Sequence, residues 1–115
     1  MSQTKLFTPQ EATQTLPLVK RVVEDILSIG QRIRQRAAED PEVSRLMDQL
    51  DGLFDELESV GCFYKDWNFS IGLVDFPSLI EGKEVFLCWK SDEPALKFYH
   101  DVDGGFDGRK PIPEE

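Results

Sequence analysis

The amino-acid sequence predicts an α+β fold, in which an N-terminal antiparallel hairpin of two helices packs on a small C-terminal antiparallel sheet of three or four strands. Three observations support this prediction. Apolar residues recur every three or four positions through most of the first 60 residues. Gly61 then ends that spacing, and short apolar runs separated by turn residues follow it. A sequence in which the helices come first and the strands follow is typical of an α+β domain.

The first predicted helix begins at Thr8. Thr8 and Glu11 can form a capping box, in which each side chain bonds the backbone N–H of the other residue. Pro9 suits the first helical position, where its missing N–H has no helical partner to lose. Pro17 interrupts the pattern and leaves two interpretations open: a short helix that ends near Thr15 before a longer one begins, or a single kinked helix.

A heptad seam runs through both predicted helices and indicates that they pair. Its positions in the first are Leu16, Val19, Val23, Ile26, Gly30, Ile33 and Ala37, and in the second Val43, Leu46, Leu50, Leu53, Leu57 and Val60. Asp40 and Pro41 predict the start of the second helix, and Gly61 predicts a left-handed cap at its end. Apolar residues outside the seam, such as Leu18 and Met47, must be buried elsewhere. They can pack against the C-terminal part of the same chain, against a second copy of the chain, or against both. Our hypothesis is that some of them form a homodimer, arranged as four helices.

The strand signals lie between residues 62 and 100. Five apolar residues in a row, Val85 to Trp89, predict a strand that is buried on both faces. A polar turn separates this strand, 84–90, from a second one at 95–100, so the two should form a hairpin. In the second strand Leu96, Phe98 and His100 should share one face. Residues 62–76 should add one or two strands.

Length and composition fit one domain over residues 1–115, with a helical hairpin at 8–60, a sheet at 61–100 and a C-terminal loop and tail at 101–115. The net charge of −9 excludes an acidic membrane surface and disfavours nucleic acid as a partner. No export signal or membrane-spanning run is visible, so we expect a cytoplasmic protein. Cys62 and Cys88 should be reduced, buried and directed into the core.

The last third of the chain gathers the residues that suit a binding site. The candidates are Asp66, Asp75, Trp89, His100, Asp101 and Arg109. His100 is the only histidine, and an aspartate beside it would orient it as a general base. Arg109 suits a carboxylate or phosphate ligand, but the favoured interpretation is that it pairs with Asp101, Asp103 or Asp107. No nucleophile elbow, phosphate loop or HExxH motif is present, so we expect no catalytic residues.

Two kinds of metal site can be weighed from the sequence. The aspartates from Asp103 onward resemble a calcium loop, but Gly105 stands where an oxygen ligand is needed and no exit helix follows. A transition-metal site on His100 lacks further imidazole or thiolate ligands, unless a dimer brings two copies of His100 together. We therefore expect neither a metal nor another cofactor.

Several short motifs occur in a characteristic order along the chain. They are Leu16-Pro17-Leu18-Val19, Lys65-Asp66, Gly72-Leu73-Val74-Asp75-Phe76-Pro77, Leu87-Cys88-Trp89, Tyr99-His100 and Gly105-Phe106-Asp107-Gly108-Arg109. In this order the chain, from Phe7 to about Pro111, resembles the small, mostly bacterial proteins of the family of unknown function DUF2203. The resemblance implies a free-standing cytoplasmic domain and carries no activity. Tyr99 departs from the pattern, in which a tryptophan would precede the histidine.

These observations favour a non-catalytic interaction or ligand-binding module that acts as a homodimer, with an unknown protein or small molecule as its other partner. One alternative is a small metal-dependent hydrolase that uses His100 and nearby aspartates. A second is an RNA-associated factor that uses Arg32, Arg34 and Arg36, in which case binding should weaken steeply with salt. No membrane partner is expected.

Overall fold

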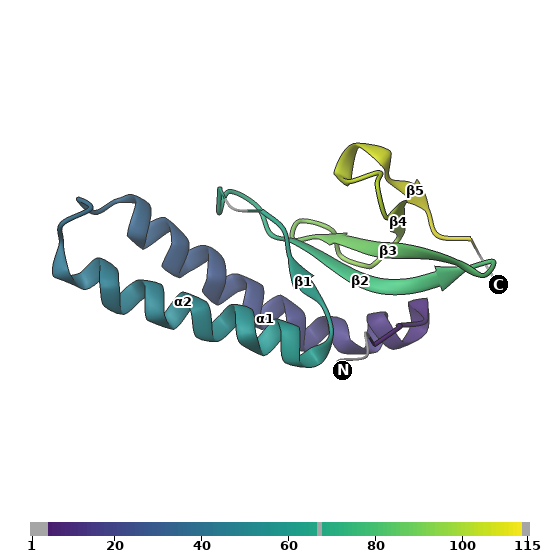
Figure 1. Cartoon of the computed structure of the whole chain (residues 1–115), viewed down its shortest axis with the longest axis horizontal. Coiled ribbons are helices and arrows are strands. Elements are labelled where there is room, and N and C mark those ends of the chain that lie inside the picture. The colour runs from purple at the N-terminus through teal and green to yellow at the C-terminus, as the bar shows by residue number, and fades with distance from the viewer. Residues whose placement is uncertain (1–4, 67, 114–115) are drawn as a thin grey trace.

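The computed structural model describes residues 5–66 and 68–113 and shows a helical hairpin beside an open antiparallel sheet (Figure 1). The elements are helices α1 (Pro9–Arg34) and α2 (Pro41–Val60), strands β1 (Phe63–Tyr64), β2 (Leu73–Ile80), β3 (Lys83–Lys90), β4 (Phe98–Asp101) and β5 (Lys110–Pro111), and the short turn η1 (Phe106–Gly108). The predicted α+β class is confirmed. The sheet has five strands in the order β1-β2-β3-β4-β5, so the predicted number of three or four strands was too low. The prediction fell short because β1 and β5 are only two residues long.

Helix α1 is one continuous helix that contains Pro17, so the interpretation with a separate short helix was wrong. Its predicted capping box is present: the Thr8 N–H donates to Glu11 Oε1 at 2.9 Å, and the Glu11 N–H donates to Thr8 Oγ1 at 3.1 Å. Pro17 lies on the exposed side of the helix, where water can satisfy the carbonyl that proline leaves without a donor. Within the described residues, no helix has the length and apolar character needed to cross a membrane.

Helix α2 begins and ends at the predicted caps. Asp40 accepts a hydrogen bond from the Glu42 N–H at 2.8 Å, and Pro41 occupies the first turn. Gly61 ends the helix in the left-handed conformation, with φ of 109°, and its N–H bonds the Leu57 and Glu58 carbonyls. This cap turns the chain directly from α2 into β1.

The inner face of the sheet, both helices and Phe7 together form the core. Val74 and Phe76 of β2 and Leu87 and Trp89 of β3 are buried there, with apolar residues of α1 that include Val19, Val23 and Ile26. Leu96 also belongs to this core. The expectation that Leu96 shares a face with His100 was therefore wrong, because regular strand alternation begins only at Phe98, where β4 starts.

The outer face of the sheet is covered by the connection from β4 to β5, residues 102–109, which includes η1. Figure 1 shows this connection on the side of the sheet opposite the helices. Phe86 and Cys88 of β3 point outward under it, and Cys88 is 2% exposed. The predicted burial of β3 on both faces is confirmed for Cys88, while Phe86 is half-buried.

The loop between β1 and β2 packs on α1 at a glycine. Phe69 has φ of 55°, and its ring lies so close to Gly30 that a Cβ on Gly30 would be 2.3 Å from Phe69 Cγ. Gln31 Nε2 donates to the Phe69 carbonyl at 3.2 Å, and Arg34 Nη1 donates to the Asn68 carbonyl at 2.6 Å. Gly30 is therefore required for close approach rather than for backbone flexibility.

We expect Gly30→Ala to lower the free energy of unfolding by about 1–3 kcal/mol, because the added methyl group must displace the Phe69 ring. Gly52→Ala is the matched control, since Gly52 lies in α2 and a Cβ there would meet nothing within 4 Å. That control should gain about 0.5–1 kcal/mol from helix propensity. Urea denaturation followed by circular dichroism measures both, and equal stabilisation by the two substitutions would contradict the Phe69 contact.

Candidate binding site on the outer face of the sheet

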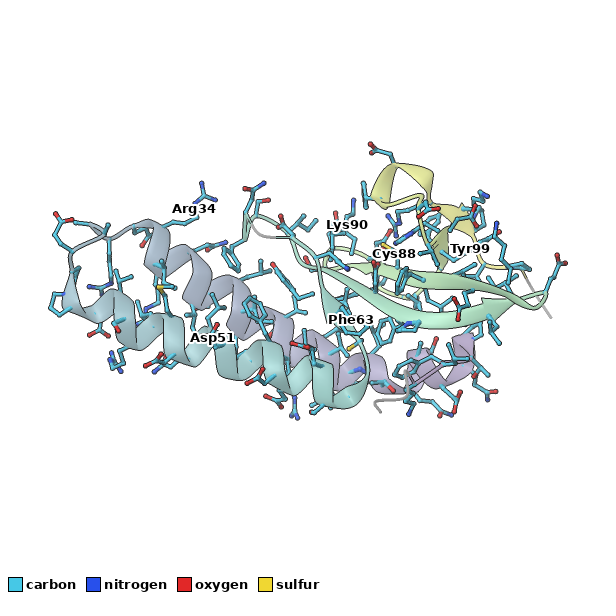
Figure 2. The ribbon with its side chains drawn as sticks, viewed as in Figure 1. Arg34, Asp51, Phe63, Cys88, Lys90 and Tyr99 are labelled. Atoms are coloured by element: carbon cyan, nitrogen blue, oxygen red, sulfur yellow. The ribbon has the colours of Figure 1, made fainter. Side chains whose placement is uncertain are left out.

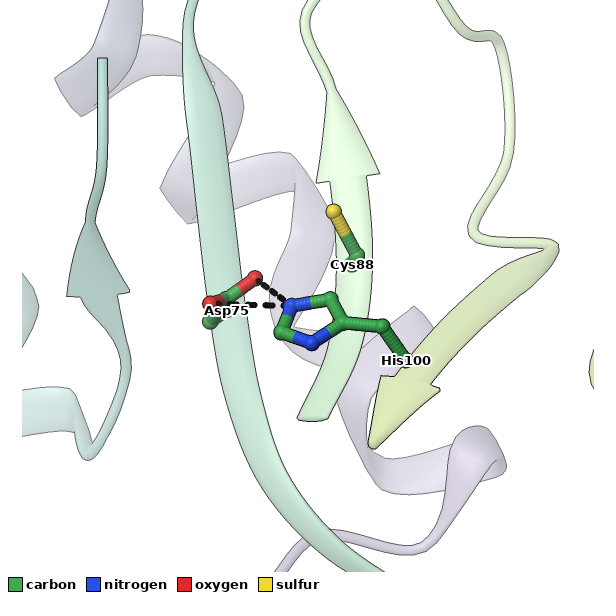
Figure 3. A group of neighbouring side chains, drawn as sticks. All are labelled: Asp75, Cys88 and His100. Atoms are coloured by element: carbon green, nitrogen blue, oxygen red, sulfur yellow. Dashed lines mark hydrogen bonds and ion pairs between the residues drawn. The ribbon is translucent and has the colours of Figure 1, made fainter. Parts of the chain in front are cut away.

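Three buried polar side chains meet on the outer face of the sheet: Asp75 of β2, Cys88 of β3 and His100 of β4 (Figure 3). Asp75 is the cross-strand partner of Cys88, and His100 is the partner of Phe86, one outward position along β3 from Cys88. One ligand atom from each of the three residues lies within 4.8 Å of the others. Their exposed fractions are 4%, 2% and 4%, so the polar trio is almost completely removed from water.

Both ring nitrogens of His100 face hydrogen-bond acceptors. Nδ1 is 2.8 Å from the backbone carbonyl of Asp101, and Nε2 is 3.1 and 3.2 Å from the two carboxylate oxygens of Asp75. A neutral imidazole carries one N–H and can donate to only one of them. When the proton is on Nδ1, the lone pair of Nε2 faces Asp75, and either a second ring proton or a bound cation makes this contact attractive.

The thiol of Cys88 is held in its protonated form. Burial raises its pKa to about 12, and the negative charge of Asp75 adds to this effect. The thiolate is the nucleophilic form of cysteine, and very little of it exists at neutral pH when the pKa is this high. Cys88 beside His100 and Asp75 therefore does not form an activated nucleophile.

A pocket of about 290 Å³, here called the outer pocket, opens above the polar trio. Its other lining residues are Lys65, Leu73, Phe86, Val102, Gly105 and Phe106. A second hollow of about 330 Å³ adjoins it and shares Phe86 and Val102. Apart from the polar trio and Lys65, the lining residues are thus apolar or glycine.

Arg109 fastens the covering segment to the sheet. Its guanidinium lies 4.3 Å from the ring centroid of Phe98 and 4.9 Å from that of Phe106. Arg109 Nη2 donates to Glu93 Oε1 at 2.6 Å and to the Cys88 carbonyl at 3.2 Å. The predicted pairing with Asp101, Asp103 or Asp107 was wrong, and the partner is Glu93. These contacts bind Arg109 to its own chain instead of leaving it directed at a ligand.

The remaining predicted site residues lie apart from the polar trio. Asp66 accepts hydrogen bonds from the backbone N–H groups of Asn68, Ser70 and Ile71 at 3.0–3.1 Å, so it organises the β1–β2 loop. Trp89 lies on the inner face, in the core. The Asp101 carboxylate pairs with Lys83 and Lys110, and only its backbone carbonyl reaches His100.

Cys88 is the member of the polar trio that the sequence analysis did not include among its candidates. The expectation that its side chain points into the core was wrong, since it lies on the side of the sheet that carries η1 (Figure 2). Strict alternation along β3 was the available signal: if Leu87 and Trp89 face the helices, Cys88 must face away.

The arginines of the RNA hypothesis lie near the tip of the helical hairpin. Arg36 forms an ion pair with Asp40 at 3.1 Å, and Arg34 is engaged with the β1–β2 loop. Figure 2 shows Arg34 extending from α1 on the side where this loop lies. The use of these arginines in RNA binding stays a prediction.

The fold and the site define a small α+β domain that combines a helix-backed sheet with a buried polar trio. The family model described as "Uncharacterized conserved protein (DUF2203)" matches residues 5–112. The chain therefore belongs to this family, as the resemblance indicated. Searches of the curated proteins and of the solved structures found no match. Because the family is uncharacterised, function has to be inferred from the site.

In chelator-treated protein at pH 8, we expect Cys62 and Cys88 to react with iodoacetamide at least about 100-fold more slowly than in urea. Burial raises the pKa of both thiols to about 12, and neither side chain is accessible. Mass spectrometry of the labelled peptides measures the two rates separately. If Cys88 in the folded protein were labelled as fast as in urea, its thiol would be exposed and activated, and this result would contradict the structure.

Proposed function

We propose that the protein is a non-catalytic binding module, which holds a small apolar ligand bearing one anionic group in the outer pocket and acts as a homodimer. The observation that supports ligand binding is the combination of apolar walls with a buried polar trio in a single pocket. Small-molecule sites in proteins typically have this composition, with a few convergent polar groups for orientation.

The lining residues favour this ligand chemistry. Leu73, Phe86, Val102 and Phe106 provide apolar contact area for a ring or a short hydrocarbon group. Lys65 lines the pocket and its ammonium is 5.9 Å from the centre of the Phe86 ring, so a positive charge lies beside the apolar surface. An aromatic carboxylate satisfies both features, because its ring packs on Phe86 while its charge is near Lys65.

Two features of the polar trio favour binding without catalysis by its own side chains. The Cys88 thiol stays protonated because burial raises its pKa to about 12. Both nitrogens of His100 already contact protein oxygen atoms, so neither is free to exchange a proton with a substrate. The metal-dependent hydrolase remains an alternative that these contacts do not test.

Ligand binding can be tested with benzoate as the probe and ¹⁵N–¹H NMR as the readout. In chelator-treated protein, we expect millimolar benzoate to shift the amide signals of Phe86, Val102, Gly105 and Phe106 most strongly. Benzyl alcohol has the same ring without the charge, so it should shift the same signals at least about threefold less at equal concentration. Shifts that are scattered over the surface, or that are absent up to the solubility limit, would overturn this proposal.

Two matched variants locate the binding surface. Val102→Asp places a carboxylate at the outer pocket and should abolish the benzoate shifts. Leu79→Asp makes the same kind of change at another exposed apolar side chain and should leave them intact, since Leu79 does not line the pocket. Equal loss in both variants would indicate non-specific binding.

The homodimer is supported by apolar surface on the helices. The half of the hairpin that carries the α1–α2 turn extends beyond the sheet (Figure 1). Met47 is 52% exposed there, and Leu18, closer to the sheet, is 37% exposed. A second copy of the same hairpin carries the same exposed apolar side chains, so two copies related by a two-fold axis can cover them for each other.

Light scattering at micromolar concentration should give twice the 13.2 kDa chain mass. Met47→Asp should shift the protein towards the monomer, since it places a charge in the helical interface. Leu79→Asp adds the same charge on the sheet and should remain dimeric. A monomer mass for the unsubstituted protein would refute the dimer.

A further inference from the structure

One tautomer of His100 leaves the polar trio without a proton or a positive charge between Nε2 and Asp75. When Nδ1–H donates to the Asp101 carbonyl, the lone pair of Nε2 faces the Asp75 carboxylate beside the Cys88 thiol. Two electron-rich groups then face each other about 3 Å apart in a site excluded from water. A cation between them converts this repulsion into attraction.

We propose that Asp75, Cys88 and His100 bind one zinc-like transition-metal ion at the floor of the outer pocket, with one coordination position left open to the pocket. The inference rests on the proposed function, because it names the group that a bound anionic ligand would meet there. It also revises the expectation of no metal, which depended on Cys88 pointing into the core.

The spacing of the ligand atoms fits a tetrahedral ion. Bonds of about 2.0–2.3 Å place neighbouring ligands roughly 3.3–3.8 Å apart in a tetrahedron. The His100 Nε2 and Asp75 oxygens are already 3.1–3.2 Å apart, and Cys88 Sγ completes a group within 4.8 Å. The ligand atoms therefore have to approach by at most about 1 Å to reach tetrahedral spacing.

The surroundings of His100 match those of a metal ligand. Histidines that bind metals usually donate the second ring N–H to a carbonyl or carboxylate, which fixes the tautomer. Here the Asp101 carbonyl is 2.8 Å from Nδ1, which leaves Nε2 as the coordinating nitrogen. This contact is set by the backbone of β4 itself.

The choice of ion follows from the donor atoms and from charge. Nitrogen, sulfur and oxygen donors together suit zinc or cobalt, whereas magnesium and calcium prefer oxygen donors alone. When the ion binds, the Cys88 S–H bond breaks and its proton goes to solvent. A divalent ion, one carboxylate, one thiolate and a neutral imidazole then sum to zero charge, which lowers the cost of burial.

The open position gives the ligand of the outer pocket a specific role. Three protein donors leave a tetrahedral ion one site short, and water or a ligand atom fills it. The trio and the apolar walls line the same pocket, so a carboxylate entering between Phe86 and Phe106 can reach the ion. The metal thus supplies the attraction for the anionic group, and the walls select its apolar part.

The test uses cobalt(II) as a spectroscopic substitute for zinc, added to the chelator-treated full-length chain. A thiolate ligand should produce a near-ultraviolet charge-transfer band that saturates at one cobalt per chain. In Cys62→Ser the only remaining cysteine is Cys88, so retention of the band assigns it to Cys88. His100 is the only histidine, so one strongly shifted, exchangeable imidazole proton in the NMR spectrum of the cobalt protein assigns the nitrogen ligand.

Substitutions of the ligands complete the test. Cys88→Ser should remove the charge-transfer band, and His100→Gln should weaken cobalt binding at least about 100-fold. Competition by zinc should displace the cobalt. The absence of a charge-transfer band in the unsubstituted protein, or its loss in Cys62→Ser with the fold intact by circular dichroism, would overturn the metal site.

The proposed metal site and the proposed ligand binding can be refuted independently. If cobalt gives no thiolate band while benzoate still shifts the pocket amides of the chelator-treated protein, the metal inference is wrong and the binding module stands. If the band is present and benzoate shifts nothing, with or without zinc, the ion is structural. That result would overturn both the proposed function and the open coordination position.

Discussion

The register between β2 and β3 is the constraint on which the rest of the structure depends. These strands pair without interruption from Leu73 opposite Lys90 to Ile80 opposite Lys83. The turn between them, Glu81-Gly82, has positive φ at both residues, which suits the right-handed twist of a two-residue hairpin. A slip of one residue would turn Asp75 towards the helices and expose Phe76 instead. The same register therefore builds the apolar core and keeps the carboxylate on the opposite face.

The connection from β3 to β4 joins the two layers through Glu93. Its backbone carbonyl accepts from Trp89 Nε1 at 2.9 Å, on the inner side of the sheet. Its carboxylate accepts from the Lys90 N–H and from Arg109, which holds the covering segment on the outer side. One residue thus ties the position of the core tryptophan to the position of the pocket cover. Arg109 fixes the covering segment to the sheet, and beside Phe86 the segment leaves the outer pocket open.

Structural features that depend on neighbouring residues were predicted better from the sequence than features that depend on residues far apart in the chain. The caps at Thr8, Asp40 and Gly61 depend on neighbours within a few residues, and all were predicted correctly. Asp75 and His100 were among the predicted site residues, but their contact depends on two strand registers that the sequence did not define. The partner of Arg109 was missed because Glu93 lies 16 residues away, on another turn. Strands as short as β1 and β5 have no periodicity of their own and form only when a neighbour offers a hydrogen-bonding edge.

The two faces of the sheet differ in chemical character. The inner face is apolar and packs against α1, so it can supply stability by burial alone. The outer face buries a carboxylate, a thiol and an imidazole, which contribute little by burial and need hydrogen-bond or charge partners. Under the proposed function, these polar groups select the occupant of the outer pocket by its charge. Because the apolar core lies on the other face of the sheet, we expect binding and release of the proposed ligand to leave the fold intact.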